Sequence, residues 1–382
     1  MQFTGFDLDH FVAHYWQKQP LLIRNPWGDW QNPLEPDELA GLACEDDVES
    51  RLVIGNDGNR TMENGPFAED RFAGLGTGPW TLLVQAVDHH VPDVAELIAP
   101  FRFVPNWRID DVMVSYATDG GGVGSHYDNY DVFLVQGLGQ RRWRVGPKCD
   151  SRTPLLPHDD LRLVAEFEAT DEWVLNPGDI LYVPPCYAHD GVAVGDDCMT
   201  YSIGFRAPSR SELIEGWAEH LAEQFSDEER YTDPDLALQA QPGEISEAAI
   251  ARLHDIVMEA ISDRAGFARW FGQHNSTPKY DRDWRPETLL DEKALLTSVA
   301  QGLPLIRNPA SRFSFIRVGP QENALFVDGQ SFKCEGESAV LAESICATPV
   351  ILLGHTDVQC ADVASLLIAL VNQGSLAFDD DG

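Results

Sequence analysis

Hydrophobic and polar positions divide the chain into stretches with different periods. Helical spacing of apolar residues, as in LDHFVAHYWQK, predicts helices over residues 8–18, 36–44 and 81–99. Residues 108–206 instead carry short apolar runs bounded by Gly and Pro, which is the pattern of a β-barrel. Helical spacing returns over residues 211–225 and 246–271, with a loop that contains Pro234 and Pro242 between them. We therefore expect an α+β protein in which a strand-rich part lies between helical parts.

The helical stretch after the strands carries more apolar surface than one chain is expected to cover. Its apolar positions at helical spacing are Leu213, Trp217, Leu221, Phe225, Ile250, Leu253, Val257, Ile261, Phe267, Trp270 and Phe271. Large apolar faces mark contacts with other molecules, so this stretch predicts a homodimer interface. We assign residues 208–276 to a helical dimerisation domain, which follows a first domain over residues 1–207.

Residues 277–382 are predicted to form a third domain. Short helices and strands alternate here, with Asp328-Gly329 as a hairpin turn, and this order resembles a winged helix. Winged helices often bind DNA, but this one lacks a basic recognition face and ends in the acidic AFDDDG. We expect a structural or protein-contact module.

The charge balance narrows the possible partners. The 382 residues include 27 Lys and Arg against 62 Asp and Glu, a net charge of −35. Such a surface repels nucleic acid and attracts basic partners. Adaptation to a saline cytosol explains the same balance, and both explanations stay open. The seven cysteines form no CxxC pair, which is typical of reduced thiols in the cytosol. We also find no signal-peptide pattern and no apolar run long enough to span a membrane. We therefore expect a soluble, cytoplasmic protein.

Candidate metal ligands lie at two places in the strand-rich part. His126 and Asp128 follow the glycine-rich GGGVGS, and their i, i+2 spacing puts both side chains on one face of a strand. His189 follows NPGDILYVPPCYA, in which a Pro-Gly turn leads into a short apolar strand. Two imidazoles and one carboxylate form the facial triad of non-heme ferrous oxygenases, which leaves positions open for a cosubstrate and oxygen. We expect a catalytic metal ion at these three residues.

A second group of possible ligands, Asp88-His89-His90, falls in the predicted helix over residues 81–99. Adjacent residues on a helix face different directions, so they do not converge on one ion. We therefore expect these residues to lie at the surface or at a helix end.

A candidate cosubstrate residue follows the first histidine by fifteen positions. The segment GLGQRRWRVG predicts a glycine turn that joins a strand over residues 131–136 to an antiparallel return strand over residues 141–145. On the return strand Arg141 shares a face with the apolar Trp143 and Val145, so it is expected to enter the barrel. A buried arginine is costly unless an anion meets it. A dicarboxylate cosubstrate would be that anion; an internal Arg–Asp pair is the alternative.

The runs HYDNYDVFLVQGLGQRRWRVG, PGDILYVPPCYAHDGVAV and FVAHYWQKQPLLIRNP resemble the Jumonji-C type 2-oxoglutarate oxygenases. The second run also resembles the second cupin motif, with Cys186 where the motif has its last Gly. The resemblance covers nearly the whole chain and implies a double-stranded β-helix barrel. It implies Fe(II) at the triad and the distal carboxylate of 2-oxoglutarate at Arg141, with Ser115 as a further cosubstrate contact. It also implies a homodimer.

Within that family the chain is most similar to bacterial arginine hydroxylases of large-subunit ribosomal protein sixteen. We expect an Fe(II)- and 2-oxoglutarate-dependent hydroxylase that uses O2, acts on an arginine of this basic protein, and releases succinate and CO2. From their positions, Asp119, Tyr116, Tyr130 and Asp131 are candidates for holding that arginine. A Jumonji-type lysine demethylase, a cupin metalloenzyme independent of 2-oxoglutarate and a non-catalytic adaptor barrel stay as alternatives.

Overall fold

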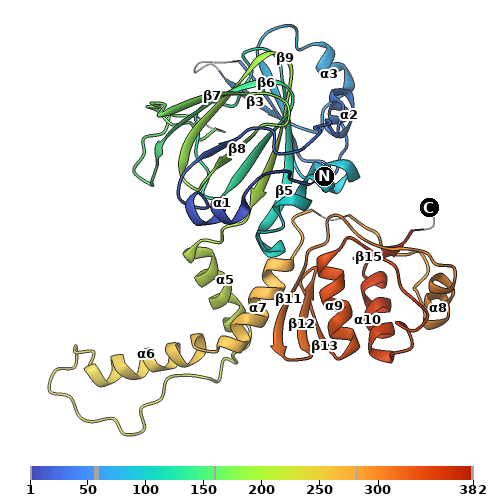
Figure 1. Cartoon of the computed structure of the whole chain (residues 1–382). Helices are drawn as coiled ribbons and strands as arrows, with labels where there is room; N and C mark the ends of the chain where they lie inside the picture. The colour runs from blue at the N-terminus through green and yellow to red at the C-terminus, as the bar shows by residue number, and fades with distance from the viewer. Residues whose placement is uncertain (1, 56–59, 159–160, 281, 380–382) are drawn as a thin grey trace. The chain divides into compact units, whose positions relative to one another are not determined.

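The computed structural model of the chain (Figure 1) describes residues 2–55, 60–158, 161–280 and 282–379. The chain divides into two compact units, residues 1–207 and 208–382. Separate hydrophobic clusters fill the two units. The three-domain division stays a prediction, and the last residues of the acidic AFDDDG end lie outside the described part.

Among the described residues of the first unit, nine strands form one sheet in the order β1-β8-β6-β9-β5-β4-β2-β3, with β7 paired to β6. The strands are β1 (Leu21–Ile23), β2 (Ser50–Ile54), β3 (Thr61–Asn64), β4 (Trp80–Val84), β5 (Ile109–Ala117), β6 (Val132–Lys148), β7 (Asp171–Leu175), β8 (Ile180–Val183) and β9 (Tyr187–Phe205). The helices are α1 (Leu8–His14), α2 (Pro36–Leu42), α3 (Glu69–Ala73) and α4 (Pro92–Ala95), with 3-10 helices over Val87–His89, Glu96–Phe101 and Asn106–Arg108. The predicted strand-rich part over residues 108–206 is confirmed.

The longest strands, β6 and β9, pair antiparallel along most of their length (Figure 1). The first part of β6 also pairs with β8, and the part from Arg141 onward pairs with β7. Bulges separate the two parts. Gly139 lies at the bulge with a φ of 56°, and a Cβ at this position would come within 2.7 Å of the carbonyl oxygen of Asp197, so the bend needs a glycine here. Bulges bend a strand without ending it. The predicted hairpin is therefore wrong, because β6 bends at the glycines and continues beside β9.

The predicted helix over residues 81–99 is wrong for its first residues, whereas helical turns do occur from Val87 onward. Its first residues belong to β4, which lies between β2 and β5 in the sheet. Sheet pairing on both sides outweighs the helical spacing of the apolar residues, because the side chains of β4 become buried there. Short helical turns follow from Val87, and Pro92 begins α4, where a missing N–H costs nothing.

Aromatic side chains attach the N-terminal segment to the sheet. The ring of Phe11 on α1 lies 5.6 Å from that of Phe133 on β6 and 4.9 Å from that of Tyr182 on β8, measured between centroids. Trp16 stacks on Tyr182 at 5.7 Å. Such pairs add about 0.5–1.5 kcal/mol each beyond their burial. They hold the start of the chain against the strands that lead into the candidate site.

The second unit contains six helices among its described residues: α5 (Arg210–Ala222), α6 (Glu247–Ile261), α7 (Arg264–Ser276), α8 (Glu292–Ala300), α9 (Glu337–Ala347) and α10 (Ala361–Asn372). Its strands are β10 (Leu305–Arg307), β11 (Phe313–Gly319), β12 (Glu322–Val327), β13 (Gln330–Glu335), β14 (Val350–Ile351) and β15 (Leu376–Phe378). They form two sheets, β11-β12-β13 and β14-β10-β15. The predicted turn at Asp328-Gly329 is confirmed, since both residues have positive φ between β12 and β13. In the described part of the chain, no helix is both long and apolar enough to cross a membrane.

The helices at the start of this unit differ in how far they are covered. Trp217 and Leu221 on α5 pack with Trp270 on α7, and all three are buried. α7 also contacts β11, β12 and β13. By contrast, α6 has no buried residue, and Leu253 and Val257 on it are 45% and 56% exposed. The apolar stripe predicted over residues 250–261 therefore faces outward.

The Asp88-His89-His90 run lies at a helix end, as one of the two predicted positions had it, because His90 caps the 3-10 helix Val87–His89. The predicted surface position is wrong for Asp88 and His89. Asp88 and His89 are buried in a 3-10 helix that contacts β5. Asp88 accepts a hydrogen bond of 2.8 Å from the backbone N–H of Val112. Burial, and to a lesser degree the nearby carboxylates Asp111 and Asp110, raise the pKa of Asp88 to about 8.

The raised pKa of Asp88 predicts that the free energy of unfolding falls as the pH rises. An ordinary Asp has a pKa of 3.8. Between that value and about 8 the unfolded chain has released a proton that the folded chain keeps, so stability declines across this window. The substitution Asp88→Asn removes the titrating carboxyl group and keeps a side-chain oxygen that can accept the hydrogen bond from the N–H of Val112. We expect urea unfolding of this variant to lose less stability between about pH 5 and about pH 8 than the unmodified chain. Asp93→Asn, an exposed change nearby, is the control, and an unchanged pH slope in Asp88→Asn would contradict the assignment.

Candidate metal centre

The three predicted ligands converge at one point of the first unit. His126 and Asp128 lie in the loop between β5 and β6, and His189 lies near the start of β9. Backbone hydrogen bonds join the two histidines in both directions, 3.0 Å from His126 N to His189 O and 2.8 Å from His189 N to His126 O. The strand predicted at His126 is a single bridge. This bridge holds the loop ligands beside β9.

Hydrogen bonds to backbone carbonyls orient both imidazoles. Nδ1 of His126 lies 2.9 Å from the carbonyl oxygen of Gly124, and Nδ1 of His189 lies 3.0 Å from that of Tyr187. The Nε2 atom of each ring is therefore free to bind a metal ion. Oδ2 of Asp128 lies 4.0 Å from Nε2 of His126 and 3.7 Å from Nε2 of His189. Bonds from a divalent metal ion to such atoms are about 2.0–2.2 Å, so one ion fits among the three. Within the described residues, this is the group of His, Cys, Asp and Glu side chains placed to hold a metal ion.

Burial favours the metal-binding form of His189. Burial, and after it the neighbouring His126, lower the pKa of this imidazole to about 4, while Asp128 opposes the shift. At neutral pH the ring is uncharged, so Nε2 offers a lone pair, as metal binding requires. The ring of Trp143 lies 5.9 Å from that of His189, between centroids, and is tilted by 45° to it.

The turn before His189 contacts the loop ligands through its backbone. Cys186 has a φ of 68°, a left-handed conformation that Gly adopts at lower cost. Its N–H donates to the carbonyl of Asp128 at 2.6 Å, and its own carbonyl accepts from the N–H of Cys149 at 2.7 Å. The Cys at this motif position therefore keeps the turn that places His189.

Arg141 is buried in the barrel, as predicted, with only 4% of its surface exposed. Its NH1 donates to the carbonyl of Gly191 at 3.4 Å, and its guanidinium carbon lies 5.8 Å from the centre of the Trp143 ring. Nε and NH2 have no hydrogen-bond partner among the described residues. No carboxylate among those residues pairs with it, so the alternative of an internal Arg–Asp pair has no support. Gly191 is two residues from His189 on β9, which places the guanidinium toward the triad.

Ser115 is buried, but its recorded contact is not with Arg141. Its Oγ lies 3.5 Å from the carbonyl of Thr200, its partner across β5 and β9. Thr200 donates to Oε1 of Gln136 at 3.2 Å. These residues lie on the other side of the β9 bend from Arg141, which pairs with Ala193. A cosubstrate contact of Ser115 stays a prediction.

The structure distributes the predicted substrate residues over different surroundings. The pKa of Tyr130 is raised by burial of its hydroxyl and by the adjacent Asp128, so this residue lies beside the triad although its ring is partly exposed. Tyr116 instead donates to Asp197 at 2.8 Å. Asp119 is exposed and accepts from the N–H of Gly195 at 2.7 Å, at the β9 bend.

Asp131 is fully buried, which corrects its predicted place at the mouth of the barrel. Its carboxylate accepts hydrogen bonds from Tyr182 Oη at 2.6 Å, from Gln17 Nε2 at 2.8 Å and from Arg108 NH2 at 3.2 Å. These donors come from β8, the N-terminal segment and the turn before β5. Asp131 therefore anchors the end of the loop that carries His126 and Asp128.

Sequence reasoning did not single out Gly191. A Cβ at this position would come within 2.6 Å of the Trp143 ring, so only glycine leaves room for the indole, and its carbonyl accepts the Arg141 hydrogen bond. The sequence could have indicated this position, because Gly191 follows His189 by two residues and so lies on the same face of the strand as this predicted ligand.

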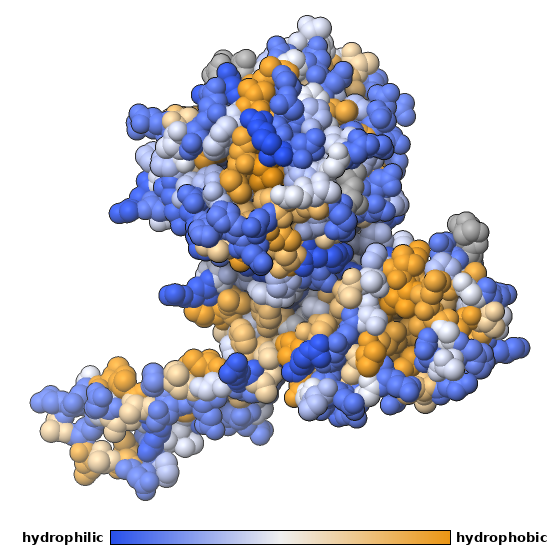
Figure 2. Space-filling model, in the orientation of Figure 1, coloured by the Kyte–Doolittle hydropathy of each residue, from blue (hydrophilic) through white to orange (hydrophobic). Residues whose placement is uncertain are grey.

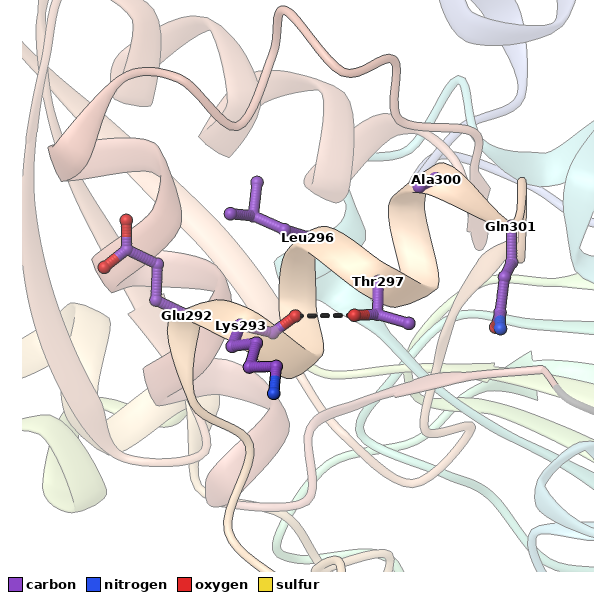
Figure 3. Close-up of a pocket in the computed structure, with 6 residues that line it drawn as sticks. All are labelled: Glu292, Lys293, Leu296, Thr297, Ala300 and Gln301. Carbon is purple, nitrogen blue, oxygen red and sulfur yellow. Dashed lines mark hydrogen bonds between the residues drawn. The ribbon is translucent and has the colours of Figure 1, made fainter.

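A shallow depression elsewhere offers little for catalysis. It is lined by α8 and by the residue that follows this helix (Figure 3): Glu292, Lys293, Leu296, Thr297, Ala300 and Gln301. Thr297 Oγ1 donates to the carbonyl of Lys293 at 2.8 Å within the helix. A single carboxylate and a lysine do not make a metal site, and the triad stays the centre of interest.

Family models match both units. A JmjC domain matches residues 96–213, and a ROXA-like winged helix matches residues 259–377. The ribosomal protein uL16 3-hydroxylase of Escherichia coli is 38% identical over 372 residues, which cover 97% of this chain and 97% of that protein. The chain belongs to the ribosomal oxygenase family. A second family member, the probable ribosomal oxygenase of Haemophilus influenzae, is 38% identical over 277 residues, 69% of this chain and 66% of that protein.

Solved structures of a ribosomal oxygenase have the same fold. An X-ray structure of Escherichia coli YcfD matches with a TM-score of 0.89 at 35% identity, covering 99% of this chain and 100% of that chain. A structure of YcfD in complex with cobalt and 2-oxoglutarate matches with a TM-score of 0.86 at 35% identity, covering 99% of both chains. The predicted JmjC barrel and winged helix are confirmed. The helical dimerisation domain stays a prediction.

Proposed function

We propose that this ribosomal oxygenase hydroxylates an arginine side chain of a large-subunit ribosomal protein, the counterpart of uL16, in the cytoplasm. The reaction would use Fe(II), 2-oxoglutarate and O2, and it would release succinate and CO2. One observation carries the proposal: the buried Arg141 has two unpartnered guanidinium nitrogens and is directed toward a His-Asp-His group. The family of the chain supplies the substrate class.

The triad residues would hold the metal ion. The two Nε2 atoms and Oδ2 of Asp128 supply the nitrogen and oxygen donors that Fe(II) accepts in a facial site. Iron bound there, with 2-oxoglutarate and O2, would supply the oxidising chemistry of the reaction. The backbone bridge between His126 and His189 sets the spacing of the ligands before any ion binds.

Arg141 would bind the distal carboxylate of 2-oxoglutarate. Its free Nε and NH2 lie on adjacent corners of the guanidinium plane, which is the geometry of a bidentate carboxylate contact. Trp143 packs between this residue and His189 and would exclude water from the cosubstrate. A cupin metalloenzyme without 2-oxoglutarate leaves the buried charge of Arg141 unexplained.

Tyr130 is the predicted substrate residue with the best support, because it lies beside Asp128 and is 43% exposed. Asp119 lies with Asp196 at the β9 bend, where the backbone N–H of Asp119 donates to Asp196 Oδ1 at 3.3 Å. These carboxylates would attract a guanidinium before it reaches the metal. The net charge of −35 would attract a basic polypeptide from a longer distance. Salt adaptation stays a second explanation of that charge.

The test is incubation of the full chain with a uL16-type protein, Fe(II), ascorbate and 2-oxoglutarate. We expect the mass of one oxygen atom on an arginine side chain, located by fragmentation. His126→Ala and Asp128→Ala should abolish both this gain and succinate release, because each removes a protein ligand of the ion. Loss of methyl groups from methyl-lysine peptides without arginine oxidation would favour the demethylase instead. Arginine oxidation in either variant would contradict the triad assignment, and no turnover at all would favour the adaptor.

The role of Arg141 can be measured separately. Arg141→Ala should raise the KM for 2-oxoglutarate at least about tenfold, since a charge-assisted bidentate contact contributes ~1.5–3 kcal/mol. The 2-oxoglutarate-dependent rise in thermal midpoint of the metal-loaded protein should shrink in parallel. Arg142→Ala, on the opposite face of β6, is the matched control and should change neither quantity. Unchanged values in Arg141→Ala would move the carboxylate contact to another residue.

We infer that α6 forms a homodimer contact. Ile250, Leu253, Ile256 and Val257 expose 45–56% of their surface on a helix that has no buried residue. Figure 2 shows apolar surface interrupted by polar side chains along this part of the chain. Isologous contacts in dimers use such faces, because one patch then covers its own copy.

Paired Asp substitutions test the contact. Leu253→Asp with Val257→Asp should convert a dimer into monomers in light scattering, because carboxylates buried at an apolar contact stay unpaired. Leu238→Asp, at a fully exposed loop position (103%), is the control and should leave the dimer intact. A dimer that survives the α6 changes with unaltered circular dichroism would place the contact elsewhere.

A further inference from the structure

The winged-helix part of the second unit has an open sheet edge at β14. The sheet order β14-β10-β15 leaves β14 with a partner on one side only. Its register pairs Ile351 with Leu305 and Val350 with Ile306, and the N–H of Arg307 donates to the carbonyl of Pro349 at 2.9 Å. β14 therefore presents an edge to which a further strand could add.

The register also decides which backbone groups face outward. In an antiparallel ladder, alternate residues direct their N–H and C=O toward the partner strand. The backbone polar groups of Pro349 and Ile351 face β10, so the N–H and C=O groups of Val350 and Leu352 face the open side. Within the described residues, no hydrogen bond outside the β10 ladder involves the backbone of either residue. These groups are donors and acceptors that an added strand would satisfy.

The side chains at this edge are apolar and exposed. Val350 is 51% exposed and Leu352 is 74% exposed, whereas the alternate Ile351 and Leu353 pack against the core of the unit. Figure 2 shows apolar surface over the α9, α10 and β15 part of this unit. Exposed edges of this kind are usually blunted by Lys or Pro. Pro349 directly precedes Val350, but its carbonyl faces β10, so it leaves the outward N–H groups of Val350 and Leu352 in place.

The charge around β14 specifies the partner. The sequence contains no Lys or Arg after Lys333. Acidic residues lie on the segments next to β14: α9, which contacts β14, carries Glu337 and Glu343, and Asp357 accepts from the N–H of Gly354 at 2.7 Å. Glu343 is paired with Arg317, so Glu337 and Asp357 are the carboxylates offered to a partner. The nearest cation on the paired strand, Arg307, donates to the carbonyl of Ile345 and lies over the ring of Phe313. Phosphate groups need clustered cations, so a nucleic acid does not fit this edge. A basic polypeptide does.

We propose that the β14 edge is a docking site for an extended, positively charged polypeptide segment. The segment would add a strand beside β14, and its backbone would form hydrogen bonds with the backbone of Val350 and Leu352. Its alternate apolar side chains would pack against the side chains of Val350 and Leu352. Its Lys or Arg residues would face the acidic surroundings. The site is independent of the metal centre and of the α6 contact.

The probe is a synthetic peptide of alternating Lys and Val, compared with one of alternating Glu and Val that has the same backbone and apolar face. Binding to the full chain is followed by fluorescence anisotropy at fixed salt. We expect the Lys peptide to bind and the Glu peptide to bind at least about tenfold more weakly. Amide hydrogen exchange over residues 348–354 should slow when the Lys peptide is bound, because outward N–H groups become bonded.

Leu352→Pro separates docking from simple charge attraction. Proline removes the outward N–H, leaves the net charge unchanged and is tolerated at a sheet edge. We expect at least about fivefold weaker binding of the Lys peptide, since one edge hydrogen bond is lost and Pro blocks strand addition. Val350→Lys should also weaken binding. Val318→Lys, at a 63% exposed position on β11, is the matched control and should have little effect.

Three outcomes would overturn the proposal. Equal binding of the Lys peptide to Leu352→Pro means that it follows the charge of the whole chain rather than the β14 edge. Unchanged hydrogen exchange over residues 348–354 places the peptide elsewhere. A change in the oligomeric state of Leu352→Pro without peptide assigns the edge to a second copy of the chain. Circular dichroism and thermal midpoints show whether each variant keeps its fold.

Discussion

A guanidinium buried without a carboxylate is the constraint around which the barrel interior is arranged. Removing such a charge from water costs several kcal/mol unless an anion compensates for it. The protein itself offers Arg141 a carbonyl of Gly191 and the face of Trp143, which are weak partners for a full charge. Under the proposed role, the cosubstrate supplies the missing anion. Cosubstrate binding and the stability of the barrel are then linked, because a ligand that binds only the folded state stabilises it.

Main-chain contacts, more than side chains, position the three predicted metal ligands. The bridge between His126 and His189 and the bond from Cys186 N–H to the Asp128 carbonyl are both backbone contacts. The buried Asp131 then fixes the end of the same loop through three donors. Backbone contacts do not depend on side-chain identity, which explains how a Cys occupies the turn position where the cupin motif has Gly.

The sequence was most informative where chemistry and short-range pattern coincide. The approach of the three predicted ligands, the inward Arg141 and the Asp328-Gly329 turn were expected from short motifs and turn chemistry, although His126 and Asp128 lie in a loop rather than on the strand that their spacing suggested. The errors came from long-range pairing. Residues 81–84 have the composition of a helix start, but β2 and β5 bury them as a strand. The glycines within β6 suggested a hairpin, and only the continuous pairing with β9 shows that they bend one strand. Asp131 could not be placed from its position, because its three donors come from distant segments.

The continuity of β6 and β9 has a consequence for the choice of cosubstrate. His189 and the residue opposite Arg141, Ala193, lie four positions apart on one strand, and both are tied to the neighbouring strand by the same ladder. Under the proposed roles, the rise along this strand pair and the reach of the Arg141 side chain to the carbonyl of Gly191 together set the distance between the metal ion and the distal carboxylate. Under the proposed roles, a keto acid one carbon shorter than 2-oxoglutarate would fall short of one anchor. Discrimination between dicarboxylates would then be a property of the sheet and of Arg141 together.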